Sequence, residues 1–487
     1  MSAPRTREET SPPAVAQSGL AAIGLTLSEW FENWFPDAFA LAIVAVAAVA
    51  GASVMIGNSP IQTAQWFGAG YWDLVAFTMQ VTMLIISGYA LASAPPVHAV
   101  IRRLAGLPKS GRGAIAFVAL FSMASSLVSW TFSLIFSALL AREVAQRVKG
   151  ADYRAIAAAA YLGVGGVWAF GLTASASLIM AAPASLPPAI LKISGVIPLS
   201  QTIGSWQSMT IAASLLAASV IIAYSSAPSE EAAHTMRDMG VVSNVDPPPP
   251  AAPVAKPEKP GEWLEYNPAL TVLIAFGAGA YLFREVAIKG ASVLLELNHY
   301  IFFFLMAGLL LHWRPKSYVR AIAEAVPSVA GVLIQYPLYA GVVRIMTESG
   351  LASRMAHFFI AASTQHTFPV LIGVYSVVLG LFVPSAGGKW LVEAPYVLEA
   401  AKALHVHLGW VVQTYNATES LANLIHPFWM LPLLGILNLK ARDIVGYATL
   451  QFVVHTPLVL FLVWAMNYTL TYIPPIVLNG LVPTPHG

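Results

Sequence analysis

Long apolar runs recur along the chain, and many of them reach the length needed to cross a lipid bilayer. Hydrophobic residues make up 57% of the sequence and charged residues only 10%, far beyond what a soluble core requires. Because a bilayer offers no water to backbone groups, such runs fold as helices. The sequence therefore predicts an all-α polytopic membrane protein, with apolar runs near 36–56, 74–95, 113–141, 155–182, 206–226, 268–287, 296–312, 326–347, 367–402, 407–437 and 444–473.

Composition and motifs argue against several other classes. The chain has no cysteine, which excludes disulfides and thiolate metal sites, and its net charge of +2 is too small to suggest a nucleic-acid partner. It carries no H-E-x-x-H pair, no G-x-S-x-G turn and no nucleotide-binding loop. We therefore expect a protein that is not an enzyme and has no cofactor or metal. A membrane-embedded enzyme for lipid or acyl substrates and a channel remain as alternatives.

The charges around the run 113–141 predict a re-entrant hairpin. Cytoplasmic loops are enriched in Lys and Arg, and both flanks of this run are basic, so a single crossing cannot join them. We expect the chain to turn within the membrane near Ser126–Leu134 and to return to the cytoplasmic side. The basic residues concerned are Arg102, Arg103, Lys109, Arg112, Arg142, Arg147, Lys149 and Arg154.

A second hairpin, 367–402, completes a predicted inverted repeat. A shift of 255 residues places Gln80 on Gln335, and the glycine-broken stretch 161–177 on the polar stretch 415–429. The two glutamines are supporting residues of the predicted site. Each half has a re-entrant helical hairpin and a broken transmembrane helix. About nine full spans plus two hairpins result, with the N-terminus inside and the C-terminus outside.

The predicted organisation has six parts. They are a disordered cytoplasmic tail (1–30), the first inverted repeat (31–226), a proline-rich cytoplasmic linker (227–266), a connecting transmembrane helix (267–295), the second inverted repeat (296–475) and a tail (476–487).

The tip of the second hairpin, "VPSAGGKW", resembles an anion cradle. Loose backbone amides at membrane depth can bind an anion in carriers with broken helices. The candidate substrate-binding residues here are Ser385, Gly387, Gly388 and Lys389. A tight turn chosen only for hairpin geometry is the alternative for the tip. Lys389 could instead neutralise Glu393 or extend toward the membrane surface.

The first hairpin offers small polar groups beside a tryptophan. Its candidate substrate-binding residues are Ser129, Trp130, Thr131 and Ser133. An ordinary helix-packing face is the alternative, since small residues are enriched where membrane helices meet.

Glu419 is the candidate coupling residue, because a carboxylate in the middle of an apolar run is costly and points to function. A structural ion pair with Lys389 or Arg344 is the alternative. Asn423 lies one turn further along the same helix face, where it could bind substrate or the coupling ion, or bond to a neighbouring helix. Proton coupling is the preferred interpretation. Sodium coupling would need Glu419 to stay ionised beside oxygen atoms such as those of Asn416 and Thr418.

Five stretches follow one another in the order "YWDLVAF", "ALASAPPV", "ALLAREVAQRV", "VPSAGGKW" and "HPFWMLP". In wording and order they resemble the short-chain fatty acid uptake family of bacterial inner membranes, within the wider ion transporter superfamily. The resemblance implies a homodimeric secondary carrier in which a transport domain slides against a scaffold. It also implies a small monocarboxylate substrate such as acetoacetate or butyrate. The chain departs from the family pattern at Lys389 and His426, which leaves substrate length and the coupling ion, H+ or Na+, open.

The predicted topology can be tested by labelling. Because the natural sequence lacks cysteine, Lys109→Cys and Arg147→Cys each introduce a unique thiol. We expect a membrane-impermeant maleimide to label both from the cytoplasmic side only, in inside-out but not right-side-out vesicles. Labelling of either position only from outside would contradict the hairpin.

Overall fold

The computed structural model describes residues 38–183, 186–241, 259–382 and 386–475, and this part of the chain is helical without any strand. The prediction of an all-α polytopic membrane protein is confirmed at this level. Six of the described helices are long and apolar enough to cross a membrane, or up to eight if each of two bent pairs is one span. The finer predictions of about nine spans, two re-entrant hairpins and inverted repeats stay predictions.

The longer helices follow the predicted apolar runs, because length and hydrophobicity are local properties of the sequence. Several shorter helices lie between those runs, where the sequence analysis expected loops. The first half contains α2 (Ala38–Met55), α3 (Pro60–Gly70), α4 (Val75–Ala92), α5 (Pro95–Leu104), α6 (Gly111–Val128), α7 (Trp130–Arg147), α8 (Tyr153–Leu162), α9 (Ser175–Ala181), α10 (Pro188–Ser194) and α11 (Trp206–Ser225).

The second half has the same kind of elements. They are α12 (Glu262–Tyr266), α13 (Pro268–Lys289), α14 (Leu297–His312), α15 (Pro315–Ala325), α16 (Ala330–Glu348), α17 (Leu351–Ala362), α18 (Phe368–Phe382), α19 (Ala386–Ala403), α20 (Leu408–Ile425), α21 (Pro427–Leu437) and α22 (Ala441–Asn467).

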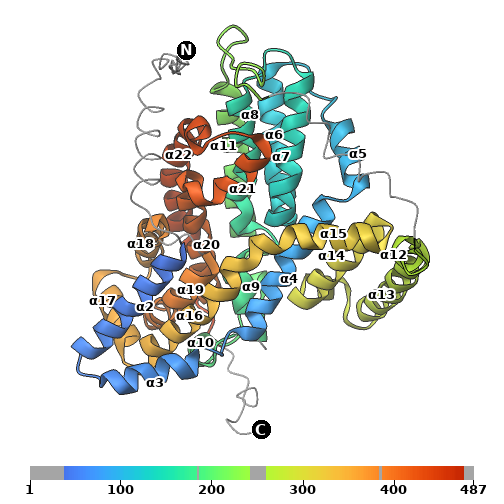
Figure 1. Cartoon of the computed structure of the whole chain (residues 1–487). Coiled ribbons are helices and arrows are strands. Elements are labelled where there is room, and N and C mark those ends of the chain that lie inside the picture. The colour runs from blue at the N-terminus through green and yellow to red at the C-terminus, as the bar shows by residue number, and fades with distance from the viewer. Residues whose placement is uncertain (1–37, 184–185, 242–258, 383–385, 476–487) are drawn as a thin grey trace, which may run out of the picture.

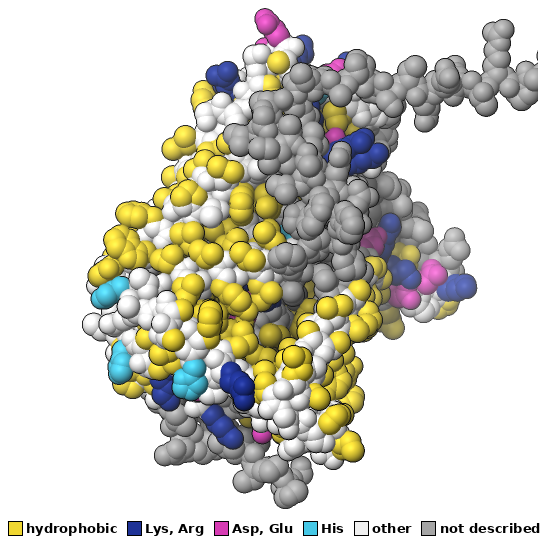
Figure 2. Space-filling model, turned by 90° about the vertical axis from the view of Figure 1, so that its left-hand side faces the viewer, with side chains coloured by type: hydrophobic (Ala, Val, Ile, Leu, Met, Phe, Trp, Pro, Cys, Tyr) yellow, Lys and Arg dark blue, Asp and Glu magenta, His cyan; other side chains and the backbone are white. Residues whose placement is uncertain are grey.

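Large hydrophobic side chains cover much of the outer surface. Figure 2 shows them spread over one face. In α13 only 17% of the most apolar 18-residue stretch is buried inside the protein. Phe276 and Phe283 are among its exposed residues. A surface of this kind suits hydrocarbon rather than water. The chain is therefore a multi-pass membrane protein.

Helix α20 lies between two apolar cores, and all of its residues are buried. One core joins it to α6, α7, α8, α11 and α22, which occupy the upper part of Figure 1. The other joins it to α4, α14, α16, α17 and α19. Because both cores close around α20, any polar group on this helix is held away from lipid and bulk water.

Two interruptions in the first half lie against each other. Ser129 ends α6 and caps α7, and α8 is followed by a π-helix (Gly163–Val167) and a 3₁₀ turn (Trp168–Phe170). The Leu172 amide donates to the Leu127 carbonyl at 2.8 Å, and the Trp130 amide donates to Thr173 Oγ1 at 3.1 Å. Each break therefore satisfies backbone groups of the other.

The beginning of the predicted linker packs against the first core. Ala227, Met236 and Val241 are buried there, and the Tyr153 amide donates to the His234 carbonyl at 2.8 Å. The proline-rich part, 242–258, lies outside the described residues. Residues 227–241 thus make packing and hydrogen-bond contacts with the helices that their composition did not indicate.

Gly171 makes a close approach that stability measurements can test. A Cβ atom at this position would lie 2.6 Å from the Leu127 carbonyl oxygen and 2.7 Å from Leu127 Cα, both backbone atoms of α6. We expect Gly171→Ala to destabilise the protein by about 1–3 kcal/mol through overpacking, measured as thermal unfolding in detergent. Gly277→Ala is the control, because no heavy atom lies within 4 Å of its added Cβ. An equal effect of both substitutions would contradict the prediction.

Candidate functional site

The site is built on α20, whose sequence places polar residues inside an apolar helix. Thr414, Asn416, Thr418 and Glu419 are fully buried, and Asn423 is 3% exposed. Polar side chains that are costly in lipid are thus enclosed by protein.

The end of α20 is set by Pro427. A proline disfavours helical geometry in the residue before it, and α20 and the following helix meet at an angle of 45°.

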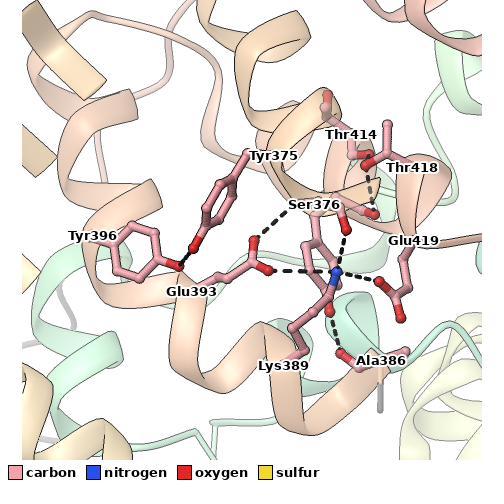
Figure 3. A network of polar contacts seen from close by, with 10 residues as sticks. Tyr375, Ser376, Ala386, Lys389, Glu393, Tyr396, Thr414, Thr418 and Glu419 are labelled. Atoms are coloured by element: carbon pink, nitrogen blue, oxygen red, sulfur yellow. Dashed lines mark hydrogen bonds and ion pairs between the residues drawn. The ribbon is translucent and has the colours of Figure 1, made fainter. Parts of the chain in front are cut away.

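Lys389 lies in the first turn of α19 and points toward Glu419 (Figure 3). Its ammonium forms an ion pair with Glu419, donates to the Ser376 carbonyl at 2.7 Å, and lies 4.9 Å from the centre of the Tyr415 ring. The lysine side chain is only 1% exposed. A lysine this deeply buried is unusual unless it is paired.

Glu393 is a further member of this cluster, which the sequence prediction considered only as a partner for Lys389. It stands four residues after Lys389 on α19, so the two side chains share one helix face. Its Oε1 lies 3.6 Å from Lys389 Nζ, and its Oε2 accepts a hydrogen bond from Ser376 Oγ at 2.9 Å. The i,i+4 spacing was the available signal in the sequence. We call Lys389, Glu393 and Glu419 the buried triad.

Arg344, the other cation considered for Glu419, is engaged elsewhere. It forms an ion pair with Asp73 at 3.3 Å, and both side chains are partly exposed. Of the two proposed partners, Lys389 is therefore the one that contacts Glu419.

The predicted cradle is described only in part. Ser385 lies outside the described residues, while Gly387 and Gly388 are buried in the first turn of α19. Amides in a first helical turn have no acceptor within their own helix. A Cβ at Gly387 would meet the Tyr336 side chain of α16, and Tyr415 donates to the Ala386 carbonyl at 2.6 Å. Two tyrosines thus approach the N-terminus of α19, and the absence of a side chain at Gly387 makes room for Tyr336.

The polar residues of the first hairpin bond within the protein. Ser129 accepts from the Phe132 amide at 3.3 Å and lies 3.0 Å from Thr131 Oγ1. Ser133 donates to the Ser122 carbonyl at 2.8 Å. The half-buried Trp130 meets Trp429 of α21 edge to face at 5.7 Å between ring centres. These contacts fit the helix-packing interpretation of this hairpin.

Of the other predicted residues, Asn416 and Asn423 bond to neighbouring helices, whereas Thr418 bonds within α20. Asn416 donates to Ser177 of α9 at 2.8 Å, and Thr418 donates to the Thr414 carbonyl of its own helix at 2.8 Å. The Asn423 backbone carbonyl accepts from Tyr161 at 2.6 Å, while its buried side-chain oxygen has no hydrogen-bond donor among the described residues.

The two supporting glutamines lie on α4 and α16. Gln80 donates to Asn298 of α14 at 2.7 Å, and Gln335 is buried. The Gln80 contact fits a link between helices. The described residues contain no group of three or more His, Cys, Asp or Glu side chains that could hold a metal ion.

Two solved transporter structures are similar to this fold. The Alcanivorax borkumensis YdaH transporter aligns with a TM-score of 0.60 at 17% identity, covering 90% of this chain and all of that one. Neisseria gonorrhoeae MtrF, described as an antimetabolite efflux pump, aligns with a TM-score of 0.56 at 14% identity, covering 92% and 98%. At these identities the similarity establishes the fold alone.

Sequence comparisons identify the family. The short chain fatty acid transporter family matches residues 20–466. A protein of Escherichia coli K12, provisionally named a short-chain fatty acid transporter, is 34% identical over 86% of this chain and 94% of its own length. One of Haemophilus influenzae Rd with the same provisional name is 32% identical over 82% and 89%. The chain therefore belongs to the short-chain fatty acid transporter family, whose members are membrane transporters and not enzymes.

Proposed function

We propose that this protein is a proton-coupled secondary carrier of small monocarboxylates of the acetoacetate or butyrate type. It would act in the bacterial inner membrane, as a homodimer with elevator-like alternating access. The single observation that best supports this proposal is the buried Lys389 between Glu393 and Glu419. A buried lysine can exchange one carboxylate partner for another, and a substrate of this class brings a carboxylate.

Binding and coupling can occur through the same ammonium. In the described state Glu419 pairs with Lys389. A substrate carboxylate that reaches Lys389 displaces Glu419, and an unpaired carboxylate in this apolar interior must take up a proton. Substrate and proton would then cross together. The amides of Gly387 and Gly388 at the start of α19 would support the substrate carboxylate.

The surroundings of Lys389 suit a short acyl chain. The rings of Trp390 and Tyr415 lie 4.8 Å apart, and both side chains are buried. Aromatic surfaces bind apolar groups, while a few placed polar groups orient the ligand. A short carboxylic acid combines both kinds of group.

Proton coupling can be tested in proteoliposomes. An outside-acid pH gradient should drive saturable accumulation of radiolabelled acetoacetate or butyrate above the level in protein-free vesicles, because weak acids also cross lipid unaided. A sodium gradient at equal pH should not. Accumulation that follows the sodium gradient alone would favour a sodium-coupled carrier, and absence of saturable transport would contradict the carrier.

The role of Lys389 predicts a loss of affinity. Lys389→Gln should weaken acetoacetate binding by about 1.5–3 kcal/mol, the scale of a charge-assisted hydrogen bond, or roughly 10- to 150-fold in Kd. Competition in counterflow transport would measure this change.

The matched control is Lys402→Gln, since Lys402 lies near the end of the same helix with an exposed side chain. A methyl ester of the substrate should not compete with acetoacetate. Equal competition by the ester, or unchanged affinity of the Lys389 variant, would argue against a carboxylate at Lys389.

A further inference from the structure

The buried triad carries an unequal number of opposite charges. Lys389 contacts both Glu393 and Glu419, and no other Lys, Arg or His among the described residues forms an ion pair with either carboxylate. All three side chains are at most 1% exposed. With both glutamates ionised, the site would hold one net negative charge away from water.

Such a net charge is costly. Moving an isolated ion into a low-dielectric interior costs several kcal/mol even after relaxation, and the same holds at membrane depth. One additional positive charge makes the triad neutral. A proton on one of the two glutamates supplies it without any further ligand.

We propose that Glu393 and Glu419 share the coupling proton as a pair, so that the site holds one proton when empty and two when substrate is bound. This proposal rests on the proposed function. When substrate binds, the Lys389–Glu419 ion pair is replaced by a Lys389–substrate ion pair. The released Glu419 carboxylate gains one proton from the aqueous side. One anion and one proton cross together, and no net charge moves.

Glu393 is suited to hold the proton of the empty site. Its Oε1 is 3.6 Å from Lys389 Nζ, beyond hydrogen-bond distance, whereas Glu419 is in close contact with the ammonium. Its Oε2 lies 2.9 Å from Ser376 Oγ, which donates in the described state. A hydroxyl can also accept, so a protonated Glu393 would reverse this bond without moving heavy atoms.

The neighbouring ionisable groups leave the proton to the carboxylates. Tyr375 of α18 and Tyr396 of α19 bond to each other at 2.9 Å beside Glu393 (Figure 3). The Tyr415 hydroxyl is occupied with the Ala386 carbonyl, and Tyr336 of α16 lies against Gly387. These phenols are neutral near pH 7, so they do not alter the charge count.

Glutamine variants of the pair test the proposal. In Glu393→Gln or Glu419→Gln one carboxylate remains, so the empty site is neutral without a proton and the loaded site is neutral with one. Each single variant should still accumulate radiolabelled acetoacetate under an outside-acid pH gradient, though more slowly than the parent.

The control substitution is Glu399→Gln, introduced into both single variants. Glu399 is a half-buried glutamate of α19, the helix that also carries Glu393. The substitution should not abolish accumulation in either. Loss of accumulation with intact exchange in Glu419→Gln alone would overturn the shared proton while leaving a proton-coupled carrier in place. Absence of pH-driven accumulation in the parent would instead reject the proposed function and the shared proton with it.

A measurement on the parent protein keeps the proposal falsifiable if the variants do not fold. Potassium diffusion potentials set with valinomycin should leave the initial rate of proton-driven acetoacetate uptake unchanged in either direction. A potential that by itself drives acetoacetate accumulation, or that changes this rate about tenfold, would show that net charge crosses with the substrate. That outcome would overturn the neutral site.

Discussion

The ion pair between Lys389 and Glu419 sets the strictest condition on how the helices of the second half surround the site. Two opposite charges at membrane depth persist only when protein surrounds both. Helix α20 meets this condition because all of its residues are buried between two cores. Helix α19, which precedes α20 in the chain and packs against it, brings the lysine to Glu419. The apolar packing of the bundle thus creates the enclosure that makes a charged site tolerable.

Irregular backbone is subject to the same constraint. The break after α8 falls on "GVGGV", where glycines weaken regular helix geometry. It is tolerated because the residues that follow bond to the turn between α6 and α7. Serine side chains of α6 satisfy further backbone groups at the break, since Ser122 accepts from the Gly163 amide at 2.9 Å and Ser126 donates to the Gly163 carbonyl at 2.7 Å. The polar turn and the serines before it therefore support the glycine-rich break in the following segment.

Local sequence properties predicted the longer helices well, but they could not decide which cation pairs with Glu419. The apolar runs gave α4, α11, α13 and α14 to within a few residues, because hydrophobicity and length belong to each segment. The choice between Lys389 and Arg344 for Glu419 depends on packing between distant segments, so the sequence left it open. Glu393 was detectable by its spacing from Lys389. The hydrogen bond of Ser133 was not, since its acceptor is the Ser122 carbonyl on the neighbouring helix α6.

Charge neutrality also bears on how such a site could move. Helix α19 packs against α16 and α17, where Tyr396 stacks on Phe359 at 5.9 Å between ring centres and Tyr336 reaches Gly387. In an elevator-like cycle, α19 would slide past these largely apolar side chains. A triad with an uncompensated charge would resist that passage, because the charge would have to cross a low-dielectric surface without water. A triad that is neutral both empty and loaded would meet a lower barrier in both directions. Electrical neutrality of the triad would thus couple the proton to the substrate and also permit the site to move.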